Sequence, residues 1–478
     1  MVVVAKDLMS RKSLSILNIN YRYQLFAALT VQLITFTHGI STGWLSPTLF
    51  HLQNDHTSPD FTLTVTEISW IGSLFGLGSL LGNIMFGVLL DRIGRKWCMY
   101  MLALPVICAW FLIYFAKTHV YLYVARFLIG ITGGGNYVVV PIFISEIADP
   151  SVRGALSSMA MLMLSFGILA GYIMSTYLDY YVNPFIIVIF PLLYLIAVTQ
   201  FPETPQHLLR KHKISDARES FKFYRNIPKT IEANSLPELR TAFEELKDNI
   251  LKANGKSEKL QVDDFFNKEA LRAFFTAIML VSLNQLSGSF AIVNYLSDIF
   301  AHTGTDIDPN TCTIIMGVVQ IFGTCFSMIV VDRVGRKVLL LASAGGTALS
   351  YTSFGIYVKF ASSEIKLQYN WLPLVIMTFV IFSTSIGLLA QVFTVIVETL
   401  PIKVRSAGTS FSMAALSCMV FVALKLFPEL MEKYGLDNLM FGCTAICVVG
   451  FLYVLIFLKE TKEIMAAYYN ISHHCICI

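Results

Sequence analysis

Charged residues recur in the same order in the two halves of the sequence. The segment DRIGRK at 91–96 returns as DRVGRK at 332–337. Two glutamate–arginine pairs show the same duplication: Glu146 with Arg153, and Glu398 with Arg405. Acidic and basic side chains around a glycine turn can bridge neighbouring helix ends, and such pairs strengthen where water is partly excluded. If they form only when one side of the protein is closed, they favour one of two states, and we expect such a switch.

Polar side chains inside an apolar run form a second candidate site. The segment SLNQLSGSFAIVNY contains Asn284, Gln285, Ser287, Asn294 and Tyr295. Amides and hydroxyls are costly in hydrocarbon unless they have partners, so they often mark a substrate pathway. Sugars need several hydrogen-bond donors and acceptors together with an aromatic face. These residues therefore indicate a site for a polyol, with hydrogen bonding between helices as the alternative.

The elements that carry these residues are apolar. Hydrophobic residues make up 55% of the 478 residues and charged residues only 14%, whereas about a quarter of a soluble domain is charged. A membrane core about 30 Å thick requires roughly 20 apolar residues per helix. Twelve runs meet this requirement: 25–45, 68–90, 97–116, 120–143, 154–177, 185–201, 274–299, 312–331, 338–358, 372–397, 407–427 and 438–458. We therefore expect an all-α integral membrane protein with twelve transmembrane helices.

The repeated landmarks divide the twelve runs into two sets of six, which predicts two six-helix bundles. A charged, amphipathic segment separates the sets and predicts a helical cytoplasmic linker. The expected divisions are a cytoplasmic N-terminus at 1–24, bundles at 25–201 and 269–458, the linker at 202–268, and a cytoplasmic tail at 459–478.

The basic residues predict the orientation. Of 35 Lys and Arg residues, only Lys117, Lys359, Lys366 and Lys433 fall in loops on the side opposite the termini. Because basic residues stay in the cytoplasm, both termini are expected there. The net charge of +4 is thus a topology signal, and we expect no nucleic-acid partner.

The sequence offers no basis for an enzyme. Its glycine clusters lie inside apolar runs without a preceding strand, so they do not form a phosphate-binding loop. The nine cysteines include no spaced CxxC or Cys/His cluster. We therefore expect no catalytic residues, no cofactor and no metal.

These motifs, together with PETPQHLL at 202–209, NQLSG at 284–288 and GISTGWLSPTL at 39–49, resemble the sugar-porter branch of the major facilitator superfamily, including its insect trehalose and hexose facilitators. The resemblance implies alternating access between two bundles at the plasma membrane. It also implies an inner salt-bridge network, with Glu203 and Arg210 joining the linker to it. The network residues would be Arg92, Glu146, Arg153, Arg333, Glu398 and Arg405.

The family's sugar contacts carry over only in part. Gln285 is kept, Asn284 stands for a second glutamine, and Gln320 stands for an asparagine. Phe393 replaces a tryptophan in a tenth run that lacks the family's two prolines. Other contacts have become Met161, Phe290, Leu416 and Ser417.

The first apolar run indicates whether transport is coupled to protons. Proton-coupled relatives have an aspartate there that faces a fourth-helix arginine. Arg126 is kept, but Ser41 occupies the aspartate's position. His38 is the remaining candidate proton site, although a neutral buried histidine is the simpler interpretation.

We expect a transporter that moves a neutral sugar, hexose or trehalose, by facilitated diffusion. The alternatives are a proton-coupled carrier, a carrier of another small solute, or a sugar sensor that does not transport. Loss of the tenth-run prolines favours the sensor, because a stiffer helix would gate poorly. Partners are expected to be the sugar and the bilayer, and the oligomeric state is left open.

Overall fold

Helices account for the regular structure of the described part of the chain. The computed structural model describes residues 21–54, 61–227, 237–255, 262–303, 305–401 and 403–460, and no strand occurs among them. The membrane helices are α2 (Arg22–Gly43), α3 (Leu45–Asn54), α4 (Val65–Ile93), α5 (Arg95–Tyr114), α6 (His119–Ile147), α7 (Pro150–Tyr177), α8 (Val182–Val198), α13 (Lys268–Leu286), α14 (Ser289–Ala301), α15 (Pro309–Val334), α16 (Arg336–Phe360), α18 (Leu372–Ile386), α19 (Val392–Thr399), α20 (Arg405–Tyr434) and α21 (Leu436–Phe457). The shorter connecting helices are α9 (Pro205–Arg210), α10 (Ile214–Tyr224), α11 (Pro237–Gly255), α12 (Val262–Phe266) and α17 (Ser363–Gln368).

The predicted membrane architecture is confirmed. Within the described residues, 10 spans are long and apolar enough to cross a membrane, with α2–α3 and α13–α14 each counted as one span. Two shorter apolar helices, α8 and α18, occupy the sixth and tenth predicted runs. Together they form the twelve-helix, all-α arrangement expected from the sequence.

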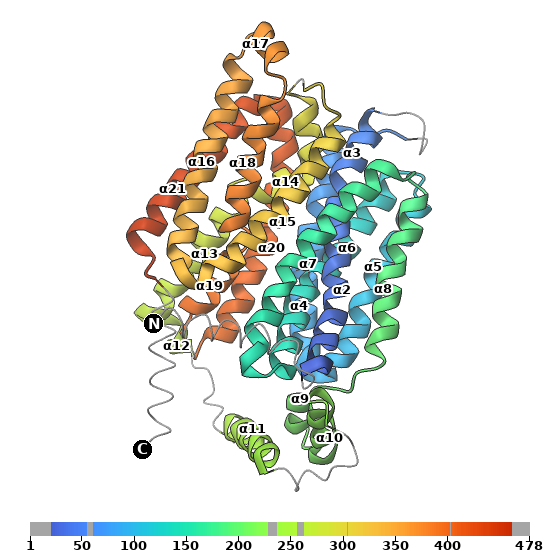
Figure 1. Ribbon diagram of the computed structural model, residues 1–478, viewed down its shortest axis with the longest axis vertical. Helices are drawn as coiled ribbons and strands as arrows, with labels where there is room; N and C mark the ends of the chain where they lie inside the picture. Colours follow the sequence, from blue (N-terminus) through green and yellow to red (C-terminus); the bar gives the residue numbers. More distant parts are fainter. Residues whose placement is uncertain are drawn as a thin grey trace, which may run out of the picture.

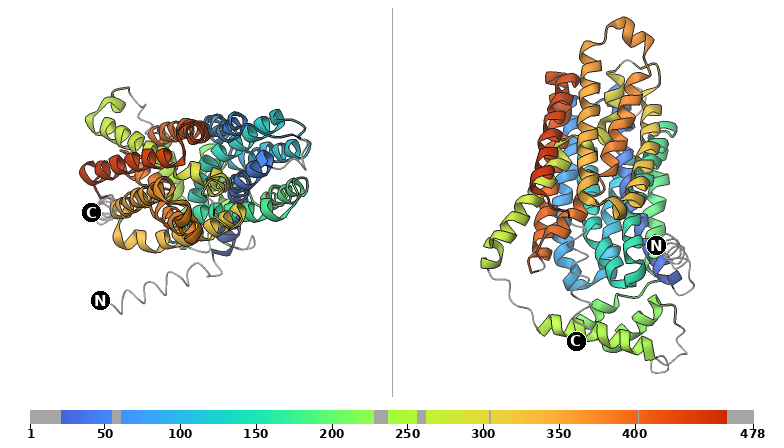
Figure 2. Two further views of the ribbon diagram at one scale, coloured as in Figure 1. Left: turned by 90° about the horizontal axis from the view of Figure 1, so that it is seen from above. Right: turned by 60° about the vertical axis from the view of Figure 1, so that its left-hand side comes forward.

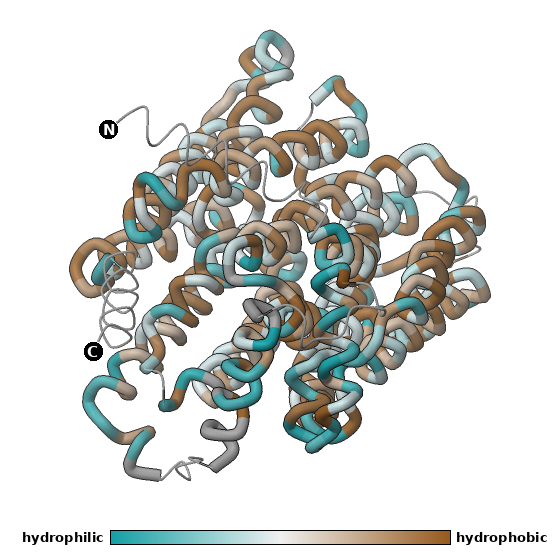
Figure 3. Tube along the Cα trace, turned by 60° about the horizontal axis from the view of Figure 1, so that its bottom comes forward, coloured by the Kyte–Doolittle hydropathy of each residue, from teal (hydrophilic) through white to brown (hydrophobic). Residues whose placement is uncertain are grey.

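The helices form two bundles that lie side by side (Figure 1). Helices α2–α8 make the N-bundle and helices α13–α21 make the C-bundle, and Figure 2 shows the same separation from above. Helices α9–α11 lie at one end, here called the linker side, whereas α17 projects from the opposite side (Figure 1). Hydrophilic residues gather on the linker side (Figure 3).

Close packing of backbones at glycines holds each bundle together. A Cβ atom added at Gly78 of α4 would lie 2.0 Å from the Phe127 carbonyl oxygen of α6. One added at Gly39 of α2 would lie 2.3 Å from the Leu164 carbonyl oxygen of α7. Small residues permit this approach in lipid, where dispersion contacts rather than the hydrophobic effect drive helix association.

Two membrane spans are broken near their middle. Gly288 adopts a left-handed conformation (φ 78°) between α13 and α14. The tenth predicted run is interrupted between Ile386 and Val392, where α18 ends and α19 begins. The expectation of a stiff tenth helix is therefore wrong. Side chains replace the missing prolines, since Ser327 donates to the Ile386 carbonyl at 2.6 Å and so satisfies a backbone group that the break releases.

Candidate substrate site and charge clusters

A central cavity lies between the two bundles, and the two broken spans contribute to its wall. The volume that the centres of water molecules can occupy in this cavity is about 80 Å³. Of the residues singled out from the sequence, those that line it are His38, Met161, Asn284, Gln285, Phe290, Gln320, Phe393, Leu416 and Ser417. No aspartate, glutamate, lysine or arginine belongs to the described lining.

The break between α13 and α14 positions the two amides. Asn284 donates from Nδ2 to the carbonyl of Leu388, in the break of the other interrupted span. Gln285 Nε2 donates to Asn284 Oδ1 at 2.5 Å. Gln285 is only 4% exposed, and its Oε1 has no hydrogen-bond partner within the described structure. A buried acceptor without a partner carries a desolvation cost, which a hydroxyl donor from a solute would relieve.

Three of the seventh-run residues singled out from the sequence do not line this cavity. Asn294 donates to the Phe290 carbonyl of its own helix at 2.8 Å. Ser287 lies beside the left-handed Gly288, and its hydroxyl bonds to that of Ser289 at 2.8 Å. Tyr295 turns towards α20, where its hydroxyl donates to the Leu424 carbonyl at 2.9 Å and its ring stacks on Phe427. Tyr295 thus corresponds to the alternative of interhelical hydrogen bonding, whereas the bonds of Ser287 stay within the break of its own span.

Aromatic rings cross the cavity between the bundles. Tyr137 of α6 stacks on Phe393 of α19 with centroids 5.9 Å apart, and Phe75 of α4 lies 6.4 Å from Phe290 of α14. Phe75 and Tyr137 were not predicted from the sequence as cavity residues. The sequence did contain a hint of the role of Tyr137, because Asn136 and Tyr137 are two consecutive polar residues inside the fourth apolar run. These rings narrow the cavity and give it the aromatic surface that sugar rings favour.

The candidate proton site consists of His38 and Arg126 and lies at one edge of the cavity. Only His38 belongs to the cavity lining. His38 lines the cavity and stacks on Phe75 at 5.5 Å. Arg126 lies behind Phe75 and donates to the carbonyls of Ser41 (3.0 Å) and Ile71 (3.2 Å). No carboxylate of the described residues lies within ion-pair distance of Arg126, so backbone carbonyls solvate its charge.

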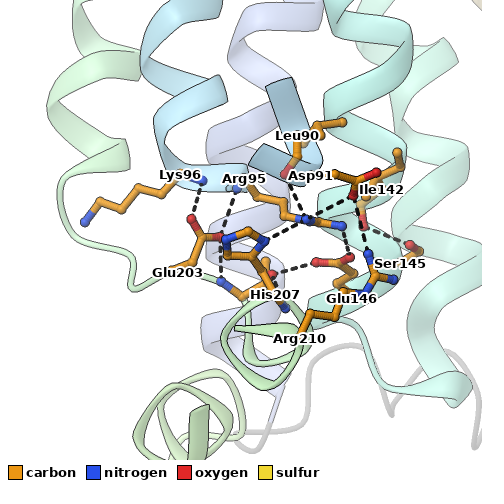
Figure 4. A network of polar contacts seen from close by, with 11 residues as sticks. Leu90, Asp91, Arg95, Lys96, Ile142, Ser145, Glu146, Glu203, His207 and Arg210 are labelled. Atoms are coloured by element: carbon orange, nitrogen blue, oxygen red, sulfur yellow. Dashed lines mark hydrogen bonds and ion pairs between the residues drawn. The ribbon is translucent and has the colours of Figure 1, made fainter. Parts of the chain in front are cut away.

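The first charge cluster closes the linker side of the N-bundle (Figure 4). Arg95, at the start of α5, is 2% exposed and pairs with Glu146 at the end of α6 over 2.7 Å. Glu203 accepts hydrogen bonds from the backbone N–H groups of Arg95 (3.1 Å) and Lys96 (3.0 Å), and it thereby caps α5. The carboxylate at this helix N-terminus also complements the helix dipole.

The linker takes part in the same cluster. His207 of α9 approaches Arg95 Nη1 through Nδ1 at 2.9 Å, and Thr204 donates to Glu146 at 2.6 Å. Burial, followed by the charge of Arg95, lowers the pKa of His207, so the ring accepts this hydrogen bond in its neutral form. Arg210, expected to join the linker to the network, lies 3.6 Å from Asp91.

The second cluster repeats this arrangement in the C-bundle. Arg336, at the start of α16, pairs with Glu398 over 3.4 Å. Glu460 accepts from the backbone N–H groups of Arg336 (3.0 Å) and Lys337 (3.2 Å). The glycines before the two helices, Gly94 and Gly335, have matching φ values of 97° and 95°. The sequence repeat is thus a repeat of structure.

The arginines nearest the glutamates differ from those expected. Arg92 and Arg333 are exposed on the last turns of α4 and α15, whereas Arg95 and Arg336 reach the carboxylates. The glycine turn causes this change, because it redirects the chain between each pair of helices. The remaining two arginines bond to nearby backbone instead: Arg153 to the Ala148 carbonyl at 3.3 Å, and Arg405 to the Leu400 carbonyl at 3.2 Å.

Comparison with known proteins places this arrangement in a family. The model of the family described as "Sugar (and other) transporter" matches residues 25–470. The chain belongs to this family. It is therefore a multi-pass membrane transporter and not an enzyme, as the sequence motifs indicated.

Several curated relatives match most of this transporter. The facilitated trehalose transporter Tret1 of Bombyx mori is 29% identical over 444 residues, which cover 92% of this chain and 84% of the relative. The Tret1 protein of Polypedilum vanderplanki is 28% identical over 445 residues, covering 92% and 86%. A solved structure of the E. coli xylose transporter XylE, in a partially occluded inward-open conformation, has the same fold, with a TM-score of 0.73 and 19% identity. It covers 92% of this chain and 100% of that one.

The bundles of the transporter also meet at the side opposite the linker. Ser46 of α3 bonds to Ser297 of α14 at 3.1 Å, and Lys425 of α20 donates to Ser69 of α4 at 2.7 Å. Lys425 also pairs with Glu429 at 2.6 Å and lies 4.4 Å from the ring centroid of Trp70. The Arg95–Glu146 and Arg336–Glu398 pairs, by contrast, each join helices of a single bundle. Lys425 is not among the residues singled out from the sequence.

Proposed function

We propose that this transporter moves a neutral sugar, a hexose or trehalose, down its gradient by alternating access. The observation that carries the proposal is the central cavity, where Asn284, Gln285 and Gln320 face aromatic rings and no charged side chain belongs to the described lining. Amides can donate to and accept from adjacent sugar hydroxyls, while an aromatic ring covers the apolar face of a sugar. The Tret1 relatives are facilitated trehalose transporters, which supports the same substrate class.

Alternating access follows from the size of the cavity. The volume of about 80 Å³ has room for roughly five to eight water molecules, since the centre of each water molecule needs about 10–15 Å³. The Tyr137–Phe393 and Phe75–Phe290 contacts must separate before a sugar can enter. Separation of rings that belong to different bundles requires that the bundles move relative to each other.

Facilitated diffusion is favoured over proton coupling. The transporter has Ser41 where proton-coupled relatives have an aspartate, and Arg126 is solvated by carbonyls. His38 stacks on Phe75, meets Tyr137 edge to face and fits a packing role. We therefore assign it no proton transfer.

We place the transporter in the plasma membrane with both termini and the 202–268 linker in the cytoplasm, because the basic residues concentrate on the linker side. Labelling from outside intact cells tests the orientation. Ser215→Cys places a cysteine on the exposed face of α10, where it should stay unlabelled by a membrane-impermeant maleimide until the cells are permeabilised. Labelling of this position in intact cells would reverse the orientation.

Uptake of radiolabelled sugars into proteoliposomes tests the substrate. Glucose or trehalose should exchange across the membrane without an imposed proton gradient, and unlabelled sugar should compete. Gln320→Leu serves as a binding-defective control, because it removes a cavity amide without changing the inner charge clusters. Failure of every tested hexose and of trehalose, in protein that is folded, would refute the proposal.

A second candidate is a carrier of a less polar small solute. Met161, Phe290, Phe393 and Leu416 occupy the cavity wall where sugar porters usually have polar groups or tryptophan. Competition by a panel of small amphipathic solutes against bound sugar would separate the two candidates. Stronger competition by an amphipathic solute than by any sugar would favour the second.

A further inference from the structure

A second hollow lies on the membrane-facing side of the C-bundle, between α20 and α21. Its volume is about 390 Å³, which is larger than that of the central cavity. Its walls are apolar, with Leu426, Phe427, Leu430 and Leu439 among them. None of its described lining residues is charged. We call this hollow the lateral groove.

The lateral groove is continuous with the lipid-facing surface. Leu426 on one wall is 44% exposed, and Gly442 on the other is also exposed. Both residues belong to membrane spans, so the medium around them is hydrocarbon. An apolar hollow of this kind binds an apolar molecule readily, because it stays free of water.

The dimensions of the groove match one leaflet. Its lining on α20 extends from Tyr434, at the end of the helix, to Ala423. At 1.5 Å per residue this distance is about 16 Å. Half of a hydrocarbon core about 30 Å thick is roughly 15 Å. The polar residues Tyr434 and Asn438 lie at the turn between α20 and α21, at the level where lipid headgroups begin.

The inner end of the groove reaches the substrate cavity. Gln285 lines both hollows, it is 4% exposed, and its Oε1 has no partner in the described structure. The left-handed Gly288 beside it also lines the groove and leaves no space for a Cβ, which would lie 2.8 Å from Cys443 Sγ. A molecule in the groove would therefore pack against the helix break that positions the cavity amides.

We propose that the lateral groove binds one acyl chain of a phospholipid from the leaflet opposite the linker. The bound chain supports the α13–α14 break and holds Gln285 towards the central cavity. Through this contact the bilayer adjusts substrate affinity. The coupling to substrate rests on the proposed function, whereas the acyl-chain site does not.

Gly442 allows the groove to be filled without disturbing the backbone. An added Cβ at Gly442 meets no atom within 4 Å, and the same is true at Gly87 of α4, a second exposed membrane glycine far from the groove. Gly442→Leu should therefore occupy the groove, and Gly87→Leu is the matched control. Gly442→Ala adds a smaller group and serves if the leucine variant folds poorly.

Photolabelling tests the site directly. The transporter is reconstituted in phosphatidylcholine vesicles that contain phosphatidylcholine with a diazirine in one acyl chain, and adducts are mapped by mass spectrometry. Ala291 and Cys443 line the groove but are buried, whereas Ile456 is 67% exposed on the outer face of α21. We expect adducts at all three in the wild type, and loss at Ala291 and Cys443 alone in Gly442→Leu. Labelling confined to Ile456 in the wild type would overturn the site.

Substrate binding in two lipids tests the coupling. Vesicles of diphytanoyl phosphatidylcholine have branched chains that are too wide to follow a narrow groove. The wild type and Gly87→Leu should bind sugar more weakly in these vesicles than in straight-chain ones, while Gly442→Leu should bind equally in both. Equal affinity of the wild type in both lipids would overturn the coupling, even where photolabelling supports the site.

Discussion

Lys425→Met is expected to open the end of the transporter opposite the linker. Lys425 makes two contacts with the other bundle, a 2.7 Å hydrogen bond to Ser69 and a cation–π contact with Trp70. Its pair with Glu429 lies within α20 and persists when the bundles separate. Only the first two contacts differ between the states, so only they can shift the equilibrium. Methionine keeps much of the apolar stem and removes the charge.

The size of the shift follows from these two contacts. A hydrogen bond from a charged donor contributes about 1.5–3 kcal/mol, and a cation–π contact near the surface about 0.5–1 kcal/mol. Lys425 is 18% exposed, so we take the lower end of both ranges, about 2 kcal/mol in total. That free energy corresponds to about a thirtyfold change in the ratio of closed to open states.

Thiol accessibility measures this ratio. Ile168 lines the central cavity from α7 and is 3% exposed, so Ile168→Cys should react with an impermeant maleimide only when the cavity opens. Applied from the side opposite the linker, the reagent should modify this cysteine faster in Lys425→Met than in its parent. Lys433→Met is the control, because Lys433 is on the same helix but lies over its neighbour Tyr434. Equal modification rates in the Lys425 and Lys433 variants would refute the role of Lys425.

Three further predictions concern the cavity, the charge clusters and the energy source. Gln285→Leu should weaken sugar binding about five- to 150-fold, since unpaired hydroxyls cost roughly 1–3 kcal/mol, and isothermal titration would show it. Glu146→Gln should lower the melting temperature more than Glu398→Gln, because Glu146 is 4% exposed and Glu398 is 10% exposed, and loss of Glu146 leaves a buried arginine without its carboxylate. Equal decreases of the melting temperature in thermal scans would argue against this. Brief exposure to a protonophore should leave uptake unchanged, since Ser41 cannot titrate, and sugar-driven proton entry that His38→Ala abolishes would contradict this.

The sequence predicted those features that depend on composition and repetition. Membrane spans follow from runs of about 20 apolar residues, because unpaired backbone groups cannot remain in hydrocarbon. The duplicated turns at 91–96 and 332–337 predicted paired clusters, since the same residue order in two bundles produces the same helix ends. The structure contains both features, membrane-length apolar helices and a charge cluster in each bundle.

Features that depend on side-chain direction were predicted less well. Arg92 and Arg95 lie three residues apart on either side of Gly94, and only the turn geometry determines which one reaches Glu146. Tyr295 was assigned to substrate by its chemistry, but a break at Gly288 turns it towards α20. Contacts between bundles leave no local pattern in the sequence, since their residues lie far apart in the chain, as do Lys425 and Ser69 with 356 positions between them.

The contacts within each bundle are stronger than those between the bundles, and this difference allows two rigid bundles to move relative to each other. Arg95 bonds to Glu146 and to the Leu90 carbonyl, and Glu203 caps α5. These contacts join α4, α5, α6 and the linker, so they resist deformation of the N-bundle. The contacts across the bundles are weaker: hydrogen bonds of hydroxyl and amide groups, a partly exposed Lys425–Glu429 pair that contacts Ser69, and stacked rings. Each of these contributes about 0.5–3 kcal/mol, and a few such contacts suffice to set a conformational equilibrium. The duplicated charges, which the sequence suggested as a switch between states, are thus better placed to keep each bundle rigid while the weaker contacts between bundles break and re-form.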